Sequence, residues 1–155
     1  MKVSDILRVK GGTLYTVSPD EGLAKAIETM SRFDIGSLAV MEHGDLVGML
    51  TFREVLHTVA KSGGSVGGAT VRSIMDDHPM SCTPETELEA VRPMMLEKHT
   101  RYMPVLDNRM LMGVISFYDV AKAIVDSQNF ENKMLKAYIR DWPEEHQPAP
   151  ASSST

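Results

Sequence analysis

The sequence predicts an α/β fold of the α+β kind, with two tandem β-α-β-β-α repeats packed sheet to sheet and a long C-terminal helix. Two observations predict the duplication. The heptad GMLTFRE at 48–54 returns as GVISFYD at 113–119, and flanking residues agree at the same offset of 65, as Leu23 does with Leu88. A fixed offset across strand-like and helix-like segments indicates two copies of one unit. Because a three-stranded sheet cannot cover both of its own faces, we expect the two sheets to pack together.

The first repeat has a legible order of apolar periods and turn residues. We expect a strand at 13–19 ended by a Ser-Pro turn, a helix at 20–33 with acids in its first turn, a strand at 35–42, a hairpin turn at 43–45, a return strand at 46–52 and a helix at 52–61. Thr51 is placed to cap this last helix, because its hydroxyl can accept from amides that have no partner in the helix.

The second repeat follows the same order. We expect a strand at 80–84, a helix at 85–99, strands at 101–107 and 111–117 with a turn between them, and a helix from 118 onward. Pro93 falls inside the first of these helices, where it should cause a kink or mark a late start. The predicted organisation is therefore repeat 1 at 1–60, a glycine-rich linker at 61–70, repeat 2 at 71–126, a C-terminal helical extension at 127–142 and a disordered tail at 143–155.

Composition and charge exclude several classes of function. The 155 residues are 43% hydrophobic and 24% charged with a net charge of −5, which disfavours a bulk-basic nucleic-acid binder. No apolar run is long enough to span a membrane and no secretory leader is evident, so we expect a cytoplasmic protein without membrane contact. The lone Cys82 excludes an internal disulfide and is typical of a buried apolar position.

No set of residues in the sequence indicates catalysis or metal binding. The five histidines lie far apart, no serine lies in a GxSxG turn, and the DDHP stretch at 76–79 is best interpreted as a polar turn. We therefore expect no enzyme activity, no catalytic cofactor and no metal.

The duplicated unit, with Gly-apolar-apolar-Ser/Thr-x-x-Asp at the last strand-to-helix turn, resembles the cystathionine β-synthase (CBS) domain pair, also called the Bateman module. The resemblance covers residues 1 to about 126, including SDIL, RSIM and the MPV of the second copy, and it extends to stand-alone single-pair proteins. It implies a signal-transduction module that senses adenosine-bearing ligands such as AMP, ADP, ATP, NAD or S-adenosylmethionine. It also implies a homodimer, for which the apolar stripe Met134, Leu135, Tyr138 and Ile139 offers a surface.

The resemblance places one ligand site in each of two clefts between the repeats. The first would join the turn of repeat 2 to strands of repeat 1, through Ser116, Tyr118, Asp119, Thr13, Leu14, Tyr15, Ile35, Gly36 and Ser37. The second would join the turn of repeat 1 to strands of repeat 2, through Thr51, Arg53, Glu54, His78, Pro79, Met80, Thr100, Arg101, Tyr102 and Pro104.

The chemistry of the heptad is compatible with this implication. Gly113 permits close approach of a ligand to the backbone, Ser116 stands at a helix N-terminus suited to phosphate, and Asp119 presents two acceptors for a ribose diol. The alternative is that Ser116 and Asp119 only cap the helix. Glu54 departs from the family aspartate by one methylene, which predicts a weaker second site, although Arg53 and Arg101 offer cations for phosphate.

Three hypotheses follow. The first is a regulatory module that binds adenosine ligands and transmits their occupancy to a protein partner that the sequence does not identify. The second is a dimerisation or partner-binding module without nucleotide sensing. The third, disfavoured by the lack of a catalytic set, is a small enzyme acting on a nucleotide.

Overall fold

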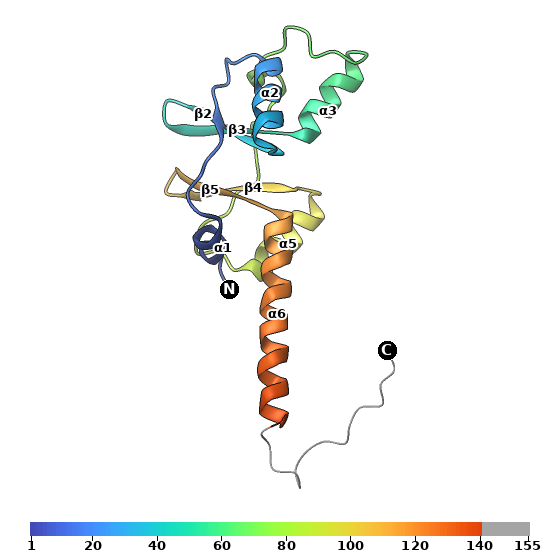
Figure 1. The fold of residues 1–155 in the computed structure, drawn as a ribbon. Coiled ribbons are helices and arrows are strands. Elements are labelled where there is room, and N and C mark those ends of the chain that lie inside the picture. The colour runs from blue at the N-terminus through green and yellow to red at the C-terminus, as the bar shows by residue number, and fades with distance from the viewer. Residues whose placement is uncertain (141–155) are drawn as a thin grey trace. The chain divides into compact units, whose positions relative to one another are not determined.

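The computed structural model describes residues 1–140, and residues 1–120 form one compact unit that contains the sheets of both repeats (Figure 1). Residues from 121 on belong to a second unit, of which the described part is helical. The elements are, in order, α1 (Val3–Lys10), β1 (Thr16–Val17), α2 (Leu23–Phe33), β2 (Ser37–Glu42), β3 (Asp45–Thr51), α3 (Phe52–Lys61), α4 (Val71–Ile74), α5 (Leu88–Glu97), β4 (Tyr102–Asp107), β5 (Met110–Ser116) and α6 (Phe117–Arg140).

The two sheets confirm the mixed fold. In repeat 1 the order is β1-β2-β3, with β1 parallel to β2 and β2 antiparallel to β3, and in repeat 2 the antiparallel pair β4-β5 has the same bulged register. Both hairpins turn through two residues of positive φ, His43 and Gly44 in one and Asn108 and Arg109 in the other. Two-residue turns of this kind match the twist of antiparallel strands.

Buried apolar residues lie where the two sheets face each other. Ala39, Met49 and Leu111 form one buried cluster, and side chains of both repeats pack against it, including Leu106 and Val114. A second core lies under α2, around Leu23, Met30 and other fully buried residues of repeat 1. The expected sheet-to-sheet packing is therefore present within the unit 1–120.

The strand expected at 80–84 is reduced to a single bridge. Cys82 pairs in parallel with Val105, the Cys82 amide donates to the Pro104 carbonyl at 3.1 Å, and the Leu106 amide donates to the Cys82 carbonyl at 2.8 Å. Pro84 lacks an N–H and cannot extend the ladder on that side. The expectation of a full third strand in repeat 2 is thus wrong in length, although its position is right.

Two helices differ from their expected bounds. Helix α2 begins at Leu23, so the acids at 20 and 21 precede it, because Gly22 is extended and the Glu21 amide closes a turn on the Ser18 carbonyl at 3.2 Å. Helix α5, expected at 85–99, runs from Leu88 to Glu97 and through Pro93, so Pro93 does not mark its start. Pro93 lies on the exposed face of α5, where water can satisfy the carbonyl that loses its partner.

At the C-terminus the long helix expected from 118 onward is present as α6, which begins at Phe117. Residues 141 and 142 and the predicted tail at 143–155 lie outside the described residues.

The leading segments of the two repeats are exchanged, which the sequence did not predict. Helix α1 docks on repeat 2, where the Val3 amide donates to the Thr86 carbonyl at 2.9 Å. In the same way α4 docks on repeat 1, where the Val71 amide donates to the Glu21 carbonyl at 2.9 Å. Val3 and Val71 are both fully buried. Each repeat therefore completes its fold with a segment that precedes the other repeat.

Candidate functional site

The turn at the end of β3 forms a capping box. The Thr51 amide and hydroxyl both donate to Glu54 Oε1, at 2.8 and 2.9 Å, and the Arg53 amide donates to Thr51 Oγ1 at 3.3 Å. This arrangement satisfies donors at the start of α3 that the helix itself leaves unpaired. The expected cap at Thr51 is confirmed, and Glu54 shares in it.

The equivalent turn at the end of β5 is capped in the same way. The Ser116 amide donates to Asp119 Oδ2 at 2.8 Å and the Asp119 amide donates to Ser116 Oγ at 3.0 Å. Lys10, at the end of α1, adds a contact that the sequence did not predict, since its Nζ lies 2.8 Å from Asp119 Oδ2 and 3.1 Å from the Val114 carbonyl oxygen. Burial alone would raise the pKa of Asp119, but Lys10 and the Ser116 donors outweigh it and hold this pKa below its usual value.

The glycines of the heptads serve the exchange of leading segments. A Cβ on Gly113 would lie 2.6 Å from Leu7 Cδ2, and a Cβ on Gly48 would lie 2.8 Å from both the Asp76 carbonyl oxygen and Met75 Sδ. Gly48 was not singled out for a ligand, but Gly113 was expected to allow one to approach. In the structure the group that approaches Gly113 is the Leu7 side chain of α1.

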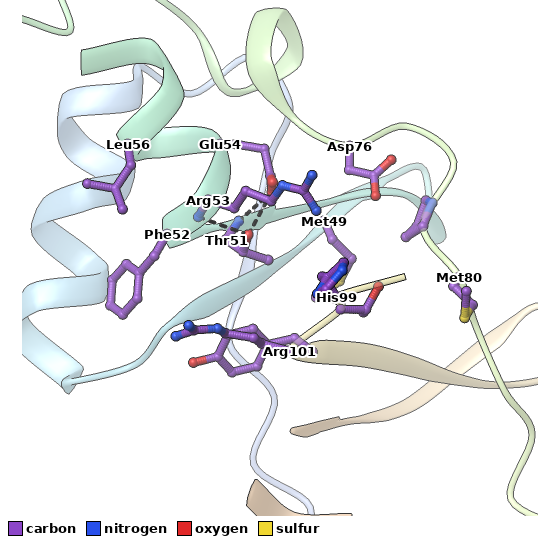
Figure 2. A pocket seen from close by; sticks show the side chains of 13 residues that line it. Met49, Thr51, Phe52, Arg53, Glu54, Leu56, Asp76, Met80, His99 and Arg101 are labelled. Atoms are coloured by element: carbon purple, nitrogen blue, oxygen red, sulfur yellow. Dashed lines mark hydrogen bonds between the residues drawn. The ribbon is translucent and has the colours of Figure 1, made fainter. Parts of the chain in front are cut away.

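A cleft of about 210 Å³ opens beside the capped turn of repeat 1 (Figure 2). Helix α3 and the end of β3 form one side, and the start of β4 with the segment before it forms the other. It is lined by Met49, Thr51, Phe52, Arg53, Glu54, Leu56, Asp76, Pro79, Met80, His99, Thr100, Arg101 and Tyr102. The cleft thus draws on both repeats within the unit 1–120.

Most residues expected at the second site line this cleft. They are Thr51, Arg53, Glu54, Pro79, Met80, Thr100, Arg101 and Tyr102. His78 and Pro104 are not among the lining residues. The His78 side chain is 90% exposed and its ring contacts Asp77 at 2.8 Å, while Pro104 is buried within β4.

Five lining residues were missed by sequence reasoning: Met49, Phe52, Leu56, Asp76 and His99. All five lie within two positions of a residue that was expected, so a wider window around each motif would have included them. Asp76 comes into the cleft through its pairing with Met49, whose amide donates to the Asp76 carbonyl at 2.9 Å. That pairing follows from the exchange of leading segments.

Of the residues expected at the first site, Ser116 and Asp119 are hydrogen-bonded to each other, and within the described residues no hydrogen bond links them to the expected strand residues of repeat 1. Asp119 is bonded to Lys10 rather than to the strand residues Thr13, Leu14 and Tyr15, which are exposed. The Tyr15 ring packs on Phe33, with ring centroids 5.1 Å apart. Tyr118 is 70% exposed, and Ile35, Gly36 and Ser37 are partly buried.

Gly36 connects the two expected sites. A Cβ on it would lie 2.6 Å from Tyr102 Cζ, so the ring of a residue that lines the cleft covers Gly36. The Gly36 carbonyl accepts the Phe52 amide at 3.2 Å, and at the equivalent place the Arg101 carbonyl accepts the Phe117 amide at 2.8 Å. Each strand-to-helix turn is therefore bonded in the same way to the segment that precedes the first hairpin strand of its own repeat.

Residues 1–140 contain neither a cluster of metal-ligating side chains nor a helix that could span a membrane. In that part of the chain no group of three or more histidine, cysteine or acidic side chains is arranged to hold a metal ion. Nor does any helix there have the length and apolar character needed to cross a membrane. The predictions of a metal-free protein and of a cytoplasmic location stay predictions. Burial raises the pKa of the Cys82 thiol to about 11, which disfavours reactivity of this side chain.

Comparison with known proteins identifies the repeats. The model of the CBS domain family matches residues 3–61 and 71–126. The CBS domain-containing protein YhcV of Bacillus subtilis is 33% identical over 107 residues, which are 68% of this chain and 75% of the relative.

Solved structures agree with the family match. The CBS-domain containing protein ATU1752 from Agrobacterium tumefaciens superposes with a TM-score of 0.75 at 30% identity, covering 79% of this chain and 98% of that one. The CBS domain pair of protein MJ0100, solved in complex with 5′-methylthioadenosine and S-adenosyl-L-methionine, superposes with a TM-score of 0.72 at 21% identity, covering 82% of this chain and 98% of that one. At that identity the likeness shows the fold alone.

Proposed function

This chain belongs to the CBS domain family as a pair of CBS repeats, a regulatory module, and from that premise we propose that it binds adenosine-bearing nucleotides in clefts between the repeats. The candidate ligands are AMP, ADP, ATP and NAD. The packing that the two repeats share would transmit ligand occupancy to a protein partner. The observation that carries the proposal is the cleft beside Thr51 and Glu54, because its two sides come from different repeats.

The lining of this cleft suits a nucleotide. Apolar side chains such as Met49, Met80 and Tyr102 can pack against a base, and the start of α3 presents amides toward an anion. Glu54 Oε1 is occupied by its own cap, but a carboxylate has lone pairs on both oxygens and can accept a ribose hydroxyl as well. The complex of the MJ0100 domain pair with two adenosine compounds supports the same ligand class for this fold.

The Ser116 and Asp119 turn, where the first site is expected, is proposed as the other position for a ligand. It has the aspartate of the family pattern, and in both turns the amide of the capping residue donates to the acid three residues later. A ribose diol would share Asp119 with Lys10 there. The residues Thr13, Leu14, Tyr15, Ile35, Gly36, Ser37 and Tyr118 stay the proposed surroundings of that ligand.

The proposal is tested by thermal unfolding with and without ligand. At a ligand concentration 100 times the dissociation constant, a ligand that binds only the folded state adds about 2.7 kcal/mol to the free energy of unfolding. AMP, ADP, ATP or NAD should therefore raise the melting temperature by several degrees, and GTP should raise it less, since the adenine edge is read by strand backbone. If none of the adenine compounds raises it, the proposal fails.

A partner-binding module without nucleotide sensing is the second candidate function. Exposed apolar side chains on α2 and α3 favour it, since Phe33 is 47%, Phe52 51% and Leu56 67% exposed. Scattered apolar residues are ordinary, but these three belong to consecutive helices of one repeat. Failure of all adenine ligands in the thermal experiment would leave this candidate in place.

A further inference from the structure

The two proposed ligand positions are equivalent in the repeat but differ in the cations that they leave without an acidic partner among residues 1–140. At the offset of 65, Arg53 corresponds to Tyr118 and Arg101 corresponds to Gly36. The Phe52 amide bonds the Gly36 carbonyl and the Phe117 amide bonds the Arg101 carbonyl, each within its own repeat, so these positions are equivalent in space as well. The cleft beside Thr51 and Glu54 therefore has two arginines, Arg53 and Arg101. The position beside Ser116 and Asp119 has Tyr118 and Gly36 in the equivalent places.

Both arginines of the cleft have their donors available. Among residues 1–140 no ion pair engages Arg53 or Arg101, whereas Arg8, Arg72 and Arg109 each contact a carboxylate. Both side chains are exposed, and Figure 2 shows them on different sides of the cleft, Arg53 from α3 and Arg101 just before β4. Each guanidinium can grip a phosphate through two parallel hydrogen bonds.

The acids of the same cleft are already engaged. Glu54 Oε1 accepts both Thr51 donors, and Asp76 Oδ1 accepts the His78 amide at 3.0 Å. These carboxylates hold the backbone of two turns, and among residues 1–140 neither forms an ion pair with Arg53 or Arg101. His99 also lines the cleft and adds a further donor.

At the other position, Lys10 is the cation that contacts Asp119 among residues 1–140, and its donors are already engaged. Lys10 Nζ bonds Asp119 Oδ2 and the Val114 carbonyl oxygen, so its charge neutralises the acid of its own site. An arginine in place of Gly36 is excluded, because the Tyr102 ring occupies the space next to its Cα. The turn of repeat 2 thus offers a phosphate chain much less than the cleft does.

We propose that the cleft beside Thr51 and Glu54 selects ligands that carry a polyphosphate chain, with Arg53 and Arg101 binding that chain from opposite repeats, while the Ser116 and Asp119 position has no such preference. This inference rests on the proposed function for the adenosine part of the ligand. The phosphate chain would connect α3 of repeat 1 to the start of β4 of repeat 2, so a diphosphate or triphosphate would link the repeats where a nucleoside would not.

The test measures dissociation constants by calorimetry for adenosine, AMP, ADP, ATP and inorganic tripolyphosphate, without metal ions. In a Lys10→Met/Asp119→Ala background, which silences the other position at unchanged net charge, ATP should bind at least about tenfold more tightly than AMP, as expected for one or more charge-assisted hydrogen bonds. Adding Arg53→Gln and Arg101→Gln should abolish that ratio and leave the adenosine constant unchanged. Arg32→Gln, on the exposed side of α2, is the matched control and should change nothing.

Two outcomes overturn the inference: an ATP-to-AMP ratio that survives loss of both arginines, or a loss of adenosine binding equal to the loss of ATP binding. Circular dichroism establishes that each variant is folded, and the two arginine changes in the otherwise unaltered chain repeat the test without the background. Tripolyphosphate separates this inference from the proposed function. If it binds through the arginines as tightly as ATP does while adenosine and AMP do not bind, the polyphosphate site stands and the proposed adenosine-binding function fails.

Discussion

Asp119 has two roles at the residue scale, because the same oxygen caps α6 and pairs with Lys10. The two residues of the pair are 109 positions apart in the sequence, and their side chains are 16% and 43% exposed, respectively. An ion pair this exposed is only moderately stabilising, but it fastens the end of α1 to repeat 2. It also means that any ribose bound at Asp119 must share the carboxylate with a resident cation.

The pH dependence of stability follows from the lowered pKa of Asp119. A carboxyl whose pKa is lower in the folded state stabilises that state above its ordinary pKa, here 3.8, and loses this contribution as the pH falls toward the lowered value. Asp119→Asn should therefore be less stable than wild type by about 1 kcal/mol at pH 7, and the difference should shrink below pH 4. Urea unfolding at several pH values measures it, and a difference that stays constant with pH would show that the ion pair is not its source.

The two heptad glycines should differ in their tolerance of a side chain. A methyl group on Gly48 meets the Asp76 carbonyl, which is held in place by paired backbone hydrogen bonds with Met49, whereas on Gly113 it meets only the end of the flexible Leu7 side chain. Gly48→Ala should lower the free energy of unfolding by about 1–3 kcal/mol, and Gly113→Ala should cost less. Denaturant unfolding of the two variants compares them directly. An equal or larger cost at Gly113 would contradict the packing described for these turns.

At this scale the sequence predicted what is local. The cap at Thr51 lies within three residues of Glu54, so residue preference alone identifies it. The contact of Lys10 with Asp119 depends on which repeat α1 packs against, and neither period nor propensity contains that information. His78 does not line the cleft for the same reason, because its neighbour Asp76 reaches the cleft through pairing with β3 while the His78 side chain is 90% exposed.

At the scale of elements, the exchange of leading segments is the main feature that the repeat pattern did not predict. Each copy contains its own leading segment in sequence, so packing within one copy is the simplest expectation. The structure instead places α1 on repeat 2 and α4 on repeat 1, with equivalent hydrogen bonds in both places. The repeats are therefore tied together by main-chain bonds as well as by their sheets. This explains why residues 1–120 form one compact unit.

The docking of α1 predicts unequal effects of two valines in the same helix. Val3 is fully buried against repeat 2, and Val9 is 87% exposed. Val3→Ala should lower the free energy of unfolding by about 1–3 kcal/mol through lost apolar burial, while Val9→Ala should stay within about 0.5 kcal/mol of wild type. Urea unfolding measures both. Equal effects of the two changes would mean that α1 is not docked through its Val3 face.

Pro93 shows how tertiary context overrides a local preference. Leu88, Val91 and Met95 are buried on one side of α5, and Pro93 lies on the other. The burial of that apolar face keeps the helix intact through a residue that removes one of its hydrogen bonds. The short strand around Cys82 is the opposite case, since it has the expected place in the sheet but lacks the length that its composition suggested.

At the scale of the whole molecule we propose a homodimer that covers the apolar side of the C-terminal helix. Met134 and Leu135 are 58% and 57% exposed, and an apolar stripe of this kind on a helix is typical of a packing surface. Light scattering at micromolar concentration should give twice the mass of the chain. Met134→Glu with Leu135→Glu should give the monomer, and Met110→Glu, at a residue 66% exposed in the β4–β5 hairpin, should leave the dimer intact. A wild-type monomer would refute the proposal.

The central claim, that adenosine ligands bind at the two acid-bearing turns, is tested most directly by calorimetric titration of AMP into the wild type and into a Glu54→Ala/Asp119→Ala variant. The matched control is Glu28→Ala/Asp107→Ala, which removes the same charge from two exposed acids away from both turns. We expect saturable binding to the wild type and the control, and a loss of affinity of at least about tenfold in the variant, as charge-assisted hydrogen bonds to the ribose disappear. Equal AMP binding by the variant and the control, or no binding to the wild type, would contradict the claim.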